Sequence, residues 1–217
     1  MVVSISGMIG SGKSTITNKL SQHYTNSIMV KEFENDDPVF NTFLNWCYGF
    51  KPNIDLGFQS YIVEALSQNF YEHLELFNKK FKNKKAFMFL DRFTLEHYIF
   101  AKITLEKKPA KYFEAFEALF EHILDVKTNP DFALFLDVNF EVVKQRIIKR
   151  NRSSEVDNFD ENLDYFYRLW SMYKDEFISL ANRYKIPFVI IDANENNEEK
   201  VLEKVINEIE KIKDKYL

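Results

Sequence analysis

Short apolar runs alternate with longer amphipathic stretches along the whole chain. Five short apolar runs predict strands at residues 2–6, 28–31, 86–90, 132–136 and 188–191. Longer stretches with apolar residues three or four positions apart predict helices at residues 13–24, 56–80, 95–106, 111–127, 140–149, 160–184 and 197–213. Strands that alternate with helices are typical of βα units, which build parallel sheets. The pattern therefore predicts an α/β fold in which a five-stranded parallel sheet is flanked by helices.

Length and composition narrow the number of domains and the kind of partner. A chain of 217 residues, 46% of them hydrophobic, is long enough for one sizeable core, so we expect a single domain over residues 1–217. The net charge of −4 argues against nucleic acid polymers and anionic membranes as partners and favours a small molecule. Cys47 is the one cysteine, which excludes an internal disulfide and fits a reducing, cytoplasmic setting. No apolar run approaches the roughly 20 residues of a membrane helix, and no targeting signal is visible.

A phosphate-binding loop follows the first predicted strand. The residues from Gly7 to Thr15 read GMIGSGKST, which matches the P-loop pattern between a strand and a helix. Backbone N–H groups of such a loop surround a phosphate, with the Lys13 ammonium on the β and γ oxygens and the Ser14 hydroxyl on Mg²⁺. The expected ATP-binding residues of the loop are Gly7, Gly10, Ser11, Gly12, Lys13, Ser14 and Thr15. The alternative is a chance glycine-rich turn.

Two predicted strands are followed by an aspartate, at Asp91 and Asp137. Either carboxylate is a candidate for the acidic side of a Mg²⁺ site. Asp91 alone is followed by an arginine, and Arg92 beside a transferring phosphoryl group would stabilise the charge that spreads over its oxygens. We therefore expect Asp91 to hold Mg²⁺ through water, and Asp137 to be a strand end that leads into the next helix.

Glu32 ends the second predicted strand, at the edge where a parallel sheet opens onto its ligand crevice. A carboxylate there is suited to accept the proton of an attacking hydroxyl, and general-base assistance is worth roughly 10² to 10⁴ in rate. The alternative is a solvated acid, since Glu34, Asp36 and Asp37 crowd the same loop. The spacing alone leaves both interpretations open.

Three arginines accompany the helix predicted at residues 140–149 and the polar segment after it. Arg146 and Arg150 lie four positions apart on one helical face, and Arg152 follows them. Guanidinium groups bind phosphate bidentately, which suits an arginine-rich lid at about residues 146–157 that closes over ATP. On charge pattern alone, a solvated face of arginines and lysines is the commoner outcome.

Together these features resemble the deoxyribonucleoside kinase family, whose members join a P-loop, a glutamate at a strand end, an Asp/Glu-Arg pair and an arginine-rich lid. The resemblance covers most of the chain, from residue 1 to about residue 192. Its most specific part beyond the P-loop is Tyr48 followed by Phe58-Gln59-Ser60-Tyr61, which is similar to the family's nucleoside pocket. The resemblance implies a P-loop NTPase fold of the nucleoside-kinase type and a homodimer built through long helices. It also implies Mg²⁺-dependent transfer of the ATP γ-phosphate to the 5′-hydroxyl of a deoxynucleoside, which yields a deoxynucleoside monophosphate and ADP.

The resemblance also implies roles for individual residues. Glu32 is implied to be the general base, and Arg92 to contact the reacting oxygens. Gln59 would read the edge of the nucleobase with its amide, which donates and accepts at once. Tyr48 and Glu155 would hold the sugar 3′-hydroxyl. Without the resemblance, Gln59 is equally well an exposed helix residue and Tyr48 an ordinary core aromatic.

Departures from the family bear on the choice of nucleobase. Some purine- and cytidine-accepting relatives have an arginine and an aspartate where this chain has Leu66 and His97. Loss of that charged pair favours a larger, less polar pocket of the thymidine-accepting or broad type. In the opposite direction, Asp91, Glu96 and Phe100 form a run similar to that of bacterial purine-type kinases. The balance favours a broad or pyrimidine-accepting pocket.

Two alternative functions follow from the same motifs. A thymidylate-type nucleoside monophosphate kinase also uses a P-loop, an Asp-Arg pair and an arginine lid. It needs cations for the acceptor phosphate, and Lys51 is the one basic residue between Glu32 and Gln59, which disfavours a dianionic acceptor. A regulatory module that binds ATP without transferring phosphate is expected to lack one of the transfer residues, and all of them are present.

Overall fold

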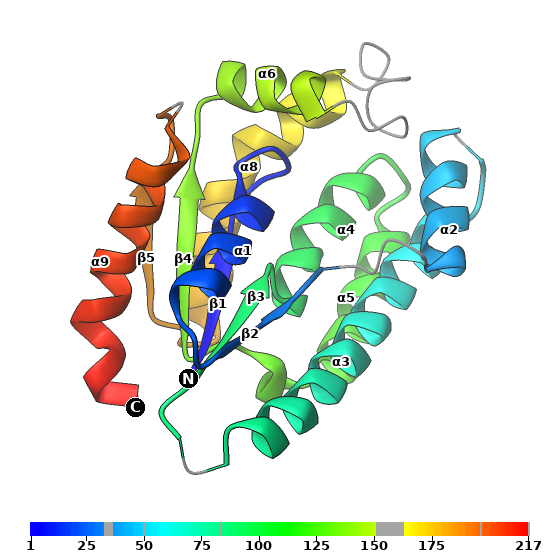
Figure 1. Ribbon diagram of the computed structural model, residues 1–217. Coiled ribbons are helices and arrows are strands. Elements are labelled where there is room, and N and C mark those ends of the chain that lie inside the picture. The colour runs from blue at the N-terminus through cyan, green and yellow to red at the C-terminus, as the bar shows by residue number, and fades with distance from the viewer. Residues whose placement is uncertain (33–36, 50, 83, 151–162, 196, 217) are drawn as a thin grey trace.

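The computed structural model describes residues 1–32, 37–49, 51–82, 84–150, 163–195 and 197–216. Within these ranges the strands are β1 (Val2–Ser6), β2 (Ser27–Val30), β3 (Phe87–Asp91), β4 (Phe132–Asp137) and β5 (Phe188–Asp192). They form one parallel sheet in the order β2-β3-β1-β4-β5 (Figure 1). The predicted α/β fold is confirmed, and each strand boundary lies within one residue of the expected one.

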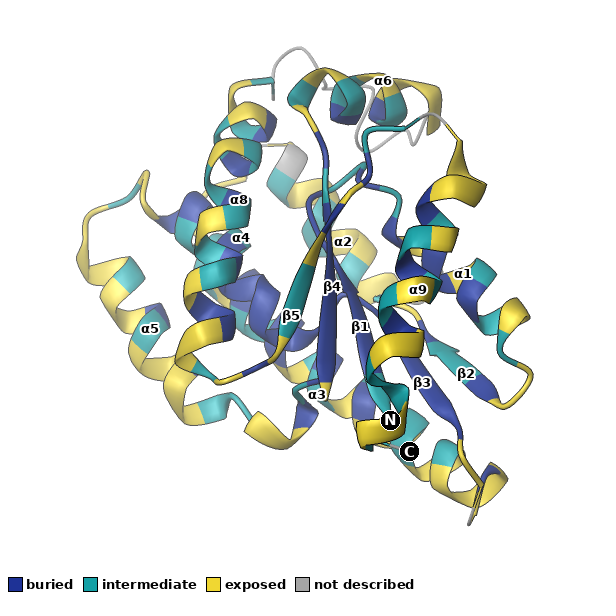
Figure 2. Cartoon of the chain, turned by 90° about the vertical axis from the view of Figure 1, so that its left-hand side faces the viewer, coloured by how far each residue is buried: buried dark blue, intermediate teal, exposed yellow. Residues whose placement is uncertain are grey.

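The middle of the sheet is buried because its strands are apolar on both faces. Val3 of β1 pairs with Phe89 of β3 on one side and with Phe132 of β4 on the other. All residues of β3 are buried. Figure 2 shows the central strands in the colour of buried residues and the exposed colour on the outer sides of the helices. Strands buried on both faces have continuous apolar sequences, which is why the apolar pattern located them.

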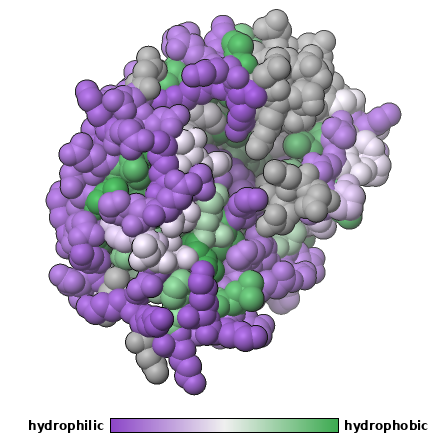
Figure 3. Space-filling view, in the orientation of Figure 1, coloured by the Kyte–Doolittle hydropathy of each residue, from purple (hydrophilic) through white to green (hydrophobic). Residues whose placement is uncertain are grey.

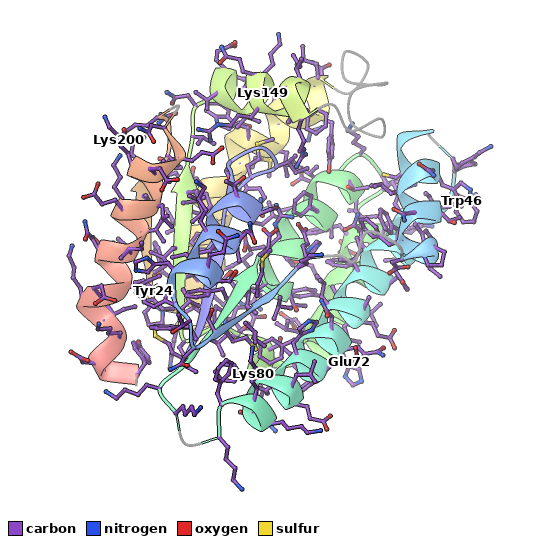
Figure 4. The ribbon with its side chains drawn as sticks, in the orientation of Figure 1. Tyr24, Trp46, Glu72, Lys80, Lys149 and Lys200 are labelled. Carbon is purple, nitrogen blue, oxygen red and sulfur yellow. The ribbon has the colours of Figure 1, made fainter. Side chains whose placement is uncertain are left out.

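Helices cover both faces of the sheet. The α-helices are α1 (Lys13–His23), α2 (Pro38–Tyr48), α3 (Asp55–Lys80), α4 (His97–Leu105), α5 (Lys111–Ile123), α6 (Phe140–Arg150), α8 (Leu163–Arg183) and α9 (Glu198–Tyr216), and the 3₁₀ helices are η1 (Thr94–Glu96) and η2 (Val126–Thr128). α1 and α9 pack on one face, and α3, α4 and α8 on the other, with α5 against α3 and α4 (Figure 1). Tyr24 joins α1 to α9, because its hydroxyl donates to Glu210 Oε1 at 2.9 Å (Figure 4). Among the described helices, none is long and apolar enough to cross a membrane.

One predicted helix is too long. The helix expected at residues 111–127 ends at Ile123, and the next residue is extended. The chain then turns into η2, because the Asp125 carboxylate accepts a hydrogen bond from the Lys127 N–H at 2.9 Å. Local bonds of this kind from an aspartate compete with helix continuation. The other helix boundaries lie within three residues of the expected ones where the structure describes them.

The apolar pattern predicts no helix at α2, although the start of this helix is signalled in the sequence. Asp37 caps it by accepting from two backbone N–H groups at 2.9 Å, and Pro38 occupies its first turn. An aspartate cap followed by proline is a recognised helix start. α2 packs on α3, where the Phe43 and Phe58 rings stack with centroids 5.3 Å apart. Trp46, whose ring meets the Phe43 ring edge-on with centroids 5.6 Å apart, is exposed and points outward from α2 (Figure 4).

The carboxyl ends of the strands meet at one edge of the sheet, at the top in Figure 1. The loop between β1 and α1 lies at this edge, and α6 crosses above it. Gly10 packs so closely on α6 that a Cβ there would lie 3.1 Å from the Val143 carbonyl oxygen. Glu32 follows β2 and Arg92 follows β3, so two residues 60 positions apart reach the same edge. In open parallel sheets this edge is where ligands bind.

Candidate active site

A large cavity opens at the carboxyl edge of the sheet. Its volume is about 1250 Å³. The P-loop, α6 and the start of α9 line one end, and α2, α3 and α4 line the other. Figure 3 shows this face of the molecule hollowed in its upper half, with hydrophilic side chains along much of the rim. Pockets for one small ligand are usually about 300–1,000 Å³, so this cavity has room for two ligands side by side.

The P-loop is shaped by three glycines with left-handed backbones. The φ angles of Gly7, Gly10 and Gly12 are 139°, 80° and 98°. A Cβ on Gly7 would lie 2.8 Å from Ser11 Oγ and 2.9 Å from the Leu136 carbonyl oxygen, so the loop requires glycine there. The loop leads into the first turn of α1, whose N–H groups have no helical acceptors. Such a loop and helix start form a cradle for a phosphate.

Lys13 lies buried beneath this cradle. Its Nζ donates to the Met8 carbonyl oxygen at 2.9 Å. Burial and the nearby Arg92 lower the pKa of Lys13 to about 8, although Asp91 and Glu32 act in the opposite direction. An anion beside Nζ would compensate for the buried charge. The lysine therefore makes the cradle selective for negative ligands.

Arg92 is held in one orientation at the centre of the site. Its Nε donates to the Tyr173 hydroxyl at 3.0 Å, its Nη2 to the Gly7 carbonyl oxygen at 3.1 Å, and its Nη1 to Glu32. The guanidinium carbon lies 4.7 Å from the centre of the Phe100 ring. Burial acts to lower the pKa of Arg92, but the nearby Glu32, Tyr173, Glu96 and Asp91 together outweigh burial, so the pKa is raised and the guanidinium stays ionised. All three nitrogens are engaged, so the guanidinium is fixed beside the P-loop.

The Glu32 carboxylate faces the cavity between nitrogen atoms of Arg92 and His97. Its side chain is 20% exposed, and its Oε1 accepts from Arg92 Nη1 and lies 3.3 Å from His97 Nε2. Burial disfavours the carboxylate, but the charge of Arg92, with help from His97 and Lys13, holds the pKa of Glu32 well below its usual range. Glu32 is therefore ionised at neutral pH and can accept a proton. A freely solvated acid, the alternative left open by the sequence, does not fit this setting.

Asp91 and Ser14 lie together beside the cradle. The Ser14 hydroxyl bonds to Asp91, whose pKa is raised by burial. Asp91 Oδ1 is buried and has no hydrogen-bond partner among the described residues. An orphaned oxygen next to a hydroxyl fits Mg²⁺, which takes few protein ligands and completes its shell with water and phosphate oxygens. The described part of the chain holds no cluster of three or more His, Cys, Asp or Glu side chains that could bind a metal ion. Asp137 instead pairs with Lys174 at 2.6 Å.

Gln59 of α3 lines the other end of the cavity. Its side chain is buried, and no described residue bonds to its Oε1. Buried amides normally have their bonds satisfied, so this oxygen is placed to meet a polar ligand. Phe40 and Ile62 line the same end with apolar surface. Tyr48 is the last residue of α2, but its side chain and the whole of Glu155 lie outside what the structure describes.

Comparison with known proteins agrees with this geometry. The family model for deoxynucleoside kinases matches residues 3–213. The chain belongs to the deoxynucleoside kinase family. The resemblance read from the motifs is confirmed.

Several relatives in the deoxynucleoside kinase family match most of the chain. The deoxyadenosine kinase of Dictyostelium discoideum is 27% identical over 202 residues, which cover 89% of this chain and 72% of that protein. The deoxyguanosine kinase of Lactobacillus johnsonii is 26% identical over 186 residues, which cover 80% and 75%. The structure of deoxyadenosine kinase from M. mycoides with bound dCTP has a TM-score of 0.74 and 24% identity, covers 98% of this chain and 100% of that one, and shows the same fold.

The predicted lid arginines of this deoxynucleoside kinase lie in different settings. Arg146 donates to the Ser11 carbonyl oxygen at 3.0 Å and to two carbonyl oxygens of the β5–α9 connection at 2.9 and 3.0 Å. It therefore ties the P-loop to the β5–α9 connection at the same end of the cavity. Arg150 also lines the cavity, near Lys149 on α6 (Figure 4). Arg152 lies outside the described residues, so its contact with ATP stays a prediction.

Three residues of the site are not among those the sequence assigned to it. Glu96 is buried, and its Oε2 accepts from the Tyr173 hydroxyl at 2.9 Å and the Gly7 N–H at 3.2 Å. Tyr173 belongs to α8, 77 positions from Glu96, and follows the apolar spacing of a core helix. His97, considered only for the nucleobase, lies against Glu32. Two signals in the sequence could have found Glu96 and His97: both follow the Asp91-Arg92 pair closely, and Glu96 belongs to the run that resembles bacterial purine-type kinases.

The buried imidazole of His97 predicts a pH dependence of stability. Burial lowers the pKa of His97, Arg92 and Lys13 act in the same direction, and Glu32 opposes them. Below the ordinary pKa of about 6.5, the unfolded chain takes up a proton that the folded chain resists, so the free energy of unfolding falls as the pH falls.

We expect the free energy of unfolding, measured with urea at pH 7.5 and 5.5, to fall more between the two pH values for the wild type than for His97→Gln. The extra fall in the wild type's free energy of unfolding has an upper limit of about 1.4 kcal/mol per pH unit. The lowered pKa of Glu32 does not affect this comparison. It stabilises the folded chain throughout this pH range, and that contribution is lost only as the pH falls below about 4.5. Equal losses in the two proteins, or a larger loss in the variant, would contradict the lowered pKa of His97.

Proposed function

We propose that this chain is an ATP-dependent deoxynucleoside kinase that phosphorylates the 5′-hydroxyl of a deoxynucleoside in the salvage of DNA precursors. The observation that carries the proposal is the placement of Glu32. Its ionised carboxylate lies inside the cavity, between the phosphate cradle above Lys13 and the nucleoside end at Gln59. A module that only binds ATP has no use for a base at this point.

The proposed reaction is an in-line displacement at the γ-phosphorus of ATP. Glu32 accepts the proton of the 5′-hydroxyl while the hydroxyl oxygen bonds to phosphorus. The bond from phosphorus to the β–γ bridging oxygen breaks, and the products are the deoxynucleoside 5′-monophosphate and ADP. Lys13 and Arg92 stabilise the charge on the transferring group, since both cations are fixed before the substrate arrives.

Ser14 and Asp91 are the proposed protein ligands of Mg²⁺, Asp91 through water. When bound, the ion would neutralise charge on the β- and γ-phosphates. Of the remaining P-loop residues, Gly10, Gly12 and Thr15 are proposed to hold the phosphates by backbone N–H groups. Gly7 and Ser11 shape the loop instead, because their N–H groups donate to Glu96 Oε2 and to the Met8 carbonyl oxygen. Arg146, Arg150 and Arg152 form the proposed lid side of the ATP site. The homodimer implied by the family resemblance and the cytoplasmic setting favoured by the single cysteine belong to the same proposal.

The nucleobase end of the site is proposed to use Gln59 for the base edge, with Tyr48 and Glu155 on the 3′-hydroxyl. Relatives that the chain matches are named deoxyadenosine and deoxyguanosine kinases, whereas Leu66 and His97 favour a broad or pyrimidine-accepting pocket. Leu66 is buried with Phe58 and Ile62, so this wall of the pocket is apolar. The test of function therefore includes both purines and pyrimidines.

The deciding experiment is an activity panel with ATP and Mg²⁺. Deoxyadenosine, deoxyguanosine, deoxycytidine and thymidine are offered as acceptors, and thymidylate is offered as a fifth. We expect a 5′-monophosphate from at least one deoxynucleoside and no diphosphate from thymidylate. Product from thymidylate alone would make the chain a monophosphate kinase, and calorimetric ATP binding without any product would make it a binding module.

A further inference from the structure

His97 lies beside the proposed base, at the start of α4. Its side chain is 4% exposed, and its ring stacks on Phe100 with centroids 5.4 Å apart and planes 27° apart. The Arg92 guanidinium also lies over the face of the Phe100 ring. One aromatic ring therefore supports both groups that contact the Glu32 carboxylate.

The two groups contact the same carboxylate oxygen. Arg92 Nη1 donates to Glu32 Oε1, and His97 Nε2 lies 3.3 Å from that oxygen. The other nitrogens of Arg92 are held by the Tyr173 hydroxyl and the Gly7 carbonyl oxygen. These contacts prevent Arg92 from binding both carboxylate oxygens of Glu32 at once, the bidentate geometry that arginine otherwise favours.

The last side-chain torsion of glutamate has a broad distribution of angles. A single hydrogen bond to one oxygen therefore does not fix which oxygen faces a substrate. A second donor on Oε1 removes that freedom. The contact of 3.3 Å is slightly longer than an ordinary N–H···O bond, and catalytic contacts of this kind commonly tighten when the substrate is bound.

We propose that His97 is a positioning residue for Glu32: its Nε2–H holds Oε1, so that Oε2 faces the cavity and takes the proton of the acceptor hydroxyl. The proposal deepens the proposed function and rests on it. It assigns His97 to the reaction rather than to the nucleobase. It also requires the neutral imidazole with its hydrogen on Nε2.

The surroundings of His97 favour that neutral form. The charged groups that act on it are Glu32 after β2, Arg92 after β3 and Lys13 at the start of α1. Burial and the two cations disfavour the imidazolium, and Glu32 opposes them. In the neutral ring, a hydrogen on Nε2 gives the carboxylate a donor, whereas a lone pair there would repel it.

Two substitutions separate positioning from packing. His97→Phe keeps an aromatic ring against Phe100 and removes the donor. His97→Gln places an amide N–H near the position of Nε2. We expect His97→Phe to lower kcat about 10-fold with the nucleoside KM changed less than about threefold, and His97→Gln to recover most of the loss. His73→Gln is the matched control, because His73 Nδ1 lies 2.9 Å from the Asn69 carbonyl oxygen of α3 and His73 is not among the described residues that line the cavity.

Three kinetic outcomes would overturn the positioning role of His97. They are wild-type kcat in His97→Phe, no recovery in His97→Gln, and a loss confined to KM, which would mean that His97 reads the nucleoside. Thermal unfolding of each variant shows whether a loss of activity is a loss of folded protein.

Nuclear magnetic resonance of the histidine ring nitrogens tests the contact without any substrate. We expect the wild type at pH 7 to show His97 as the neutral tautomer with its proton on Nε2, and that resonance to shift in Glu32→Gln. A proton on Nδ1 would overturn the proposal. If the wild type phosphorylates no acceptor, the proposed function fails, and the tautomer still decides whether His97 orients Glu32.

Discussion

Glu32→Gln is expected to lower kcat by at least about 10², while nucleoside binding stays within about threefold of wild type. Glutamine has nearly the same size as glutamate, so the contacts of Oε1 with Arg92 and His97 can persist. The amide cannot take up the proton of the 5′-hydroxyl. The loss therefore belongs to the chemical step, and it is measured by steady-state kinetics together with calorimetric binding of the deoxynucleoside.

Glu72→Gln is the matched control for this substitution. Glu72 lies on the same side of the sheet but on the exposed surface of α3, where it points away from the body (Figure 4). We expect its turnover to equal that of the wild type. Near-wild-type turnover in Glu32→Gln would remove Glu32 from the reaction and, with it, the observation on which the proposed function depends.

Arg92→Lys is expected to lower kcat by about 10² or more, although the charge is kept. Lysine presents one ammonium where arginine presents three nitrogens with separate acceptors. The Tyr173 hydroxyl and the Gly7 carbonyl oxygen would lose their donor inside the protein. We therefore also expect the melting temperature to fall by roughly 5 °C, since unsatisfied buried groups cost about 1–3 kcal/mol each.

The control for this second prediction is Arg168→Lys. Arg168 pairs with Glu106 at 3.3 Å in a largely exposed setting, where ion pairs contribute little. Its kinetics and melting temperature should stay at wild-type values. If Arg92→Lys behaved in the same way, the bonds to Tyr173 and Gly7 would have no part in holding the reacting group.

Much of the site follows from where the strands end. Glu32 and the Asp91-Arg92 pair each come directly after a short apolar run, and the P-loop follows another. Parallel strands place their carboxyl ends at one edge, so these residues must meet if the runs are strands. Periodicity and motif spacing are local properties, and they were sufficient for the sheet, for the P-loop and for placing Glu32 at the sheet edge. The proposed role of Glu32 as a base came from the family resemblance instead. α2 was within reach of the same kind of reasoning, because the Asp37-Pro38 start is local too.

The contacts that orient the reacting groups depend instead on long-range packing. Tyr173 meets Arg92 across 81 positions, and Arg146 meets Ser11 across 135. No spacing in the chain distinguishes Tyr173 from the other aromatic residues of a core helix, or His97 from a reader of the nucleobase. Their partners are set by how α8 and α4 pack against the sheet, because a buried polar group bonds to whatever the fold brings within about 3 Å of it. Chain order therefore places the proposed reacting groups at one edge of the sheet, and the packing of the helices decides which polar groups contact them.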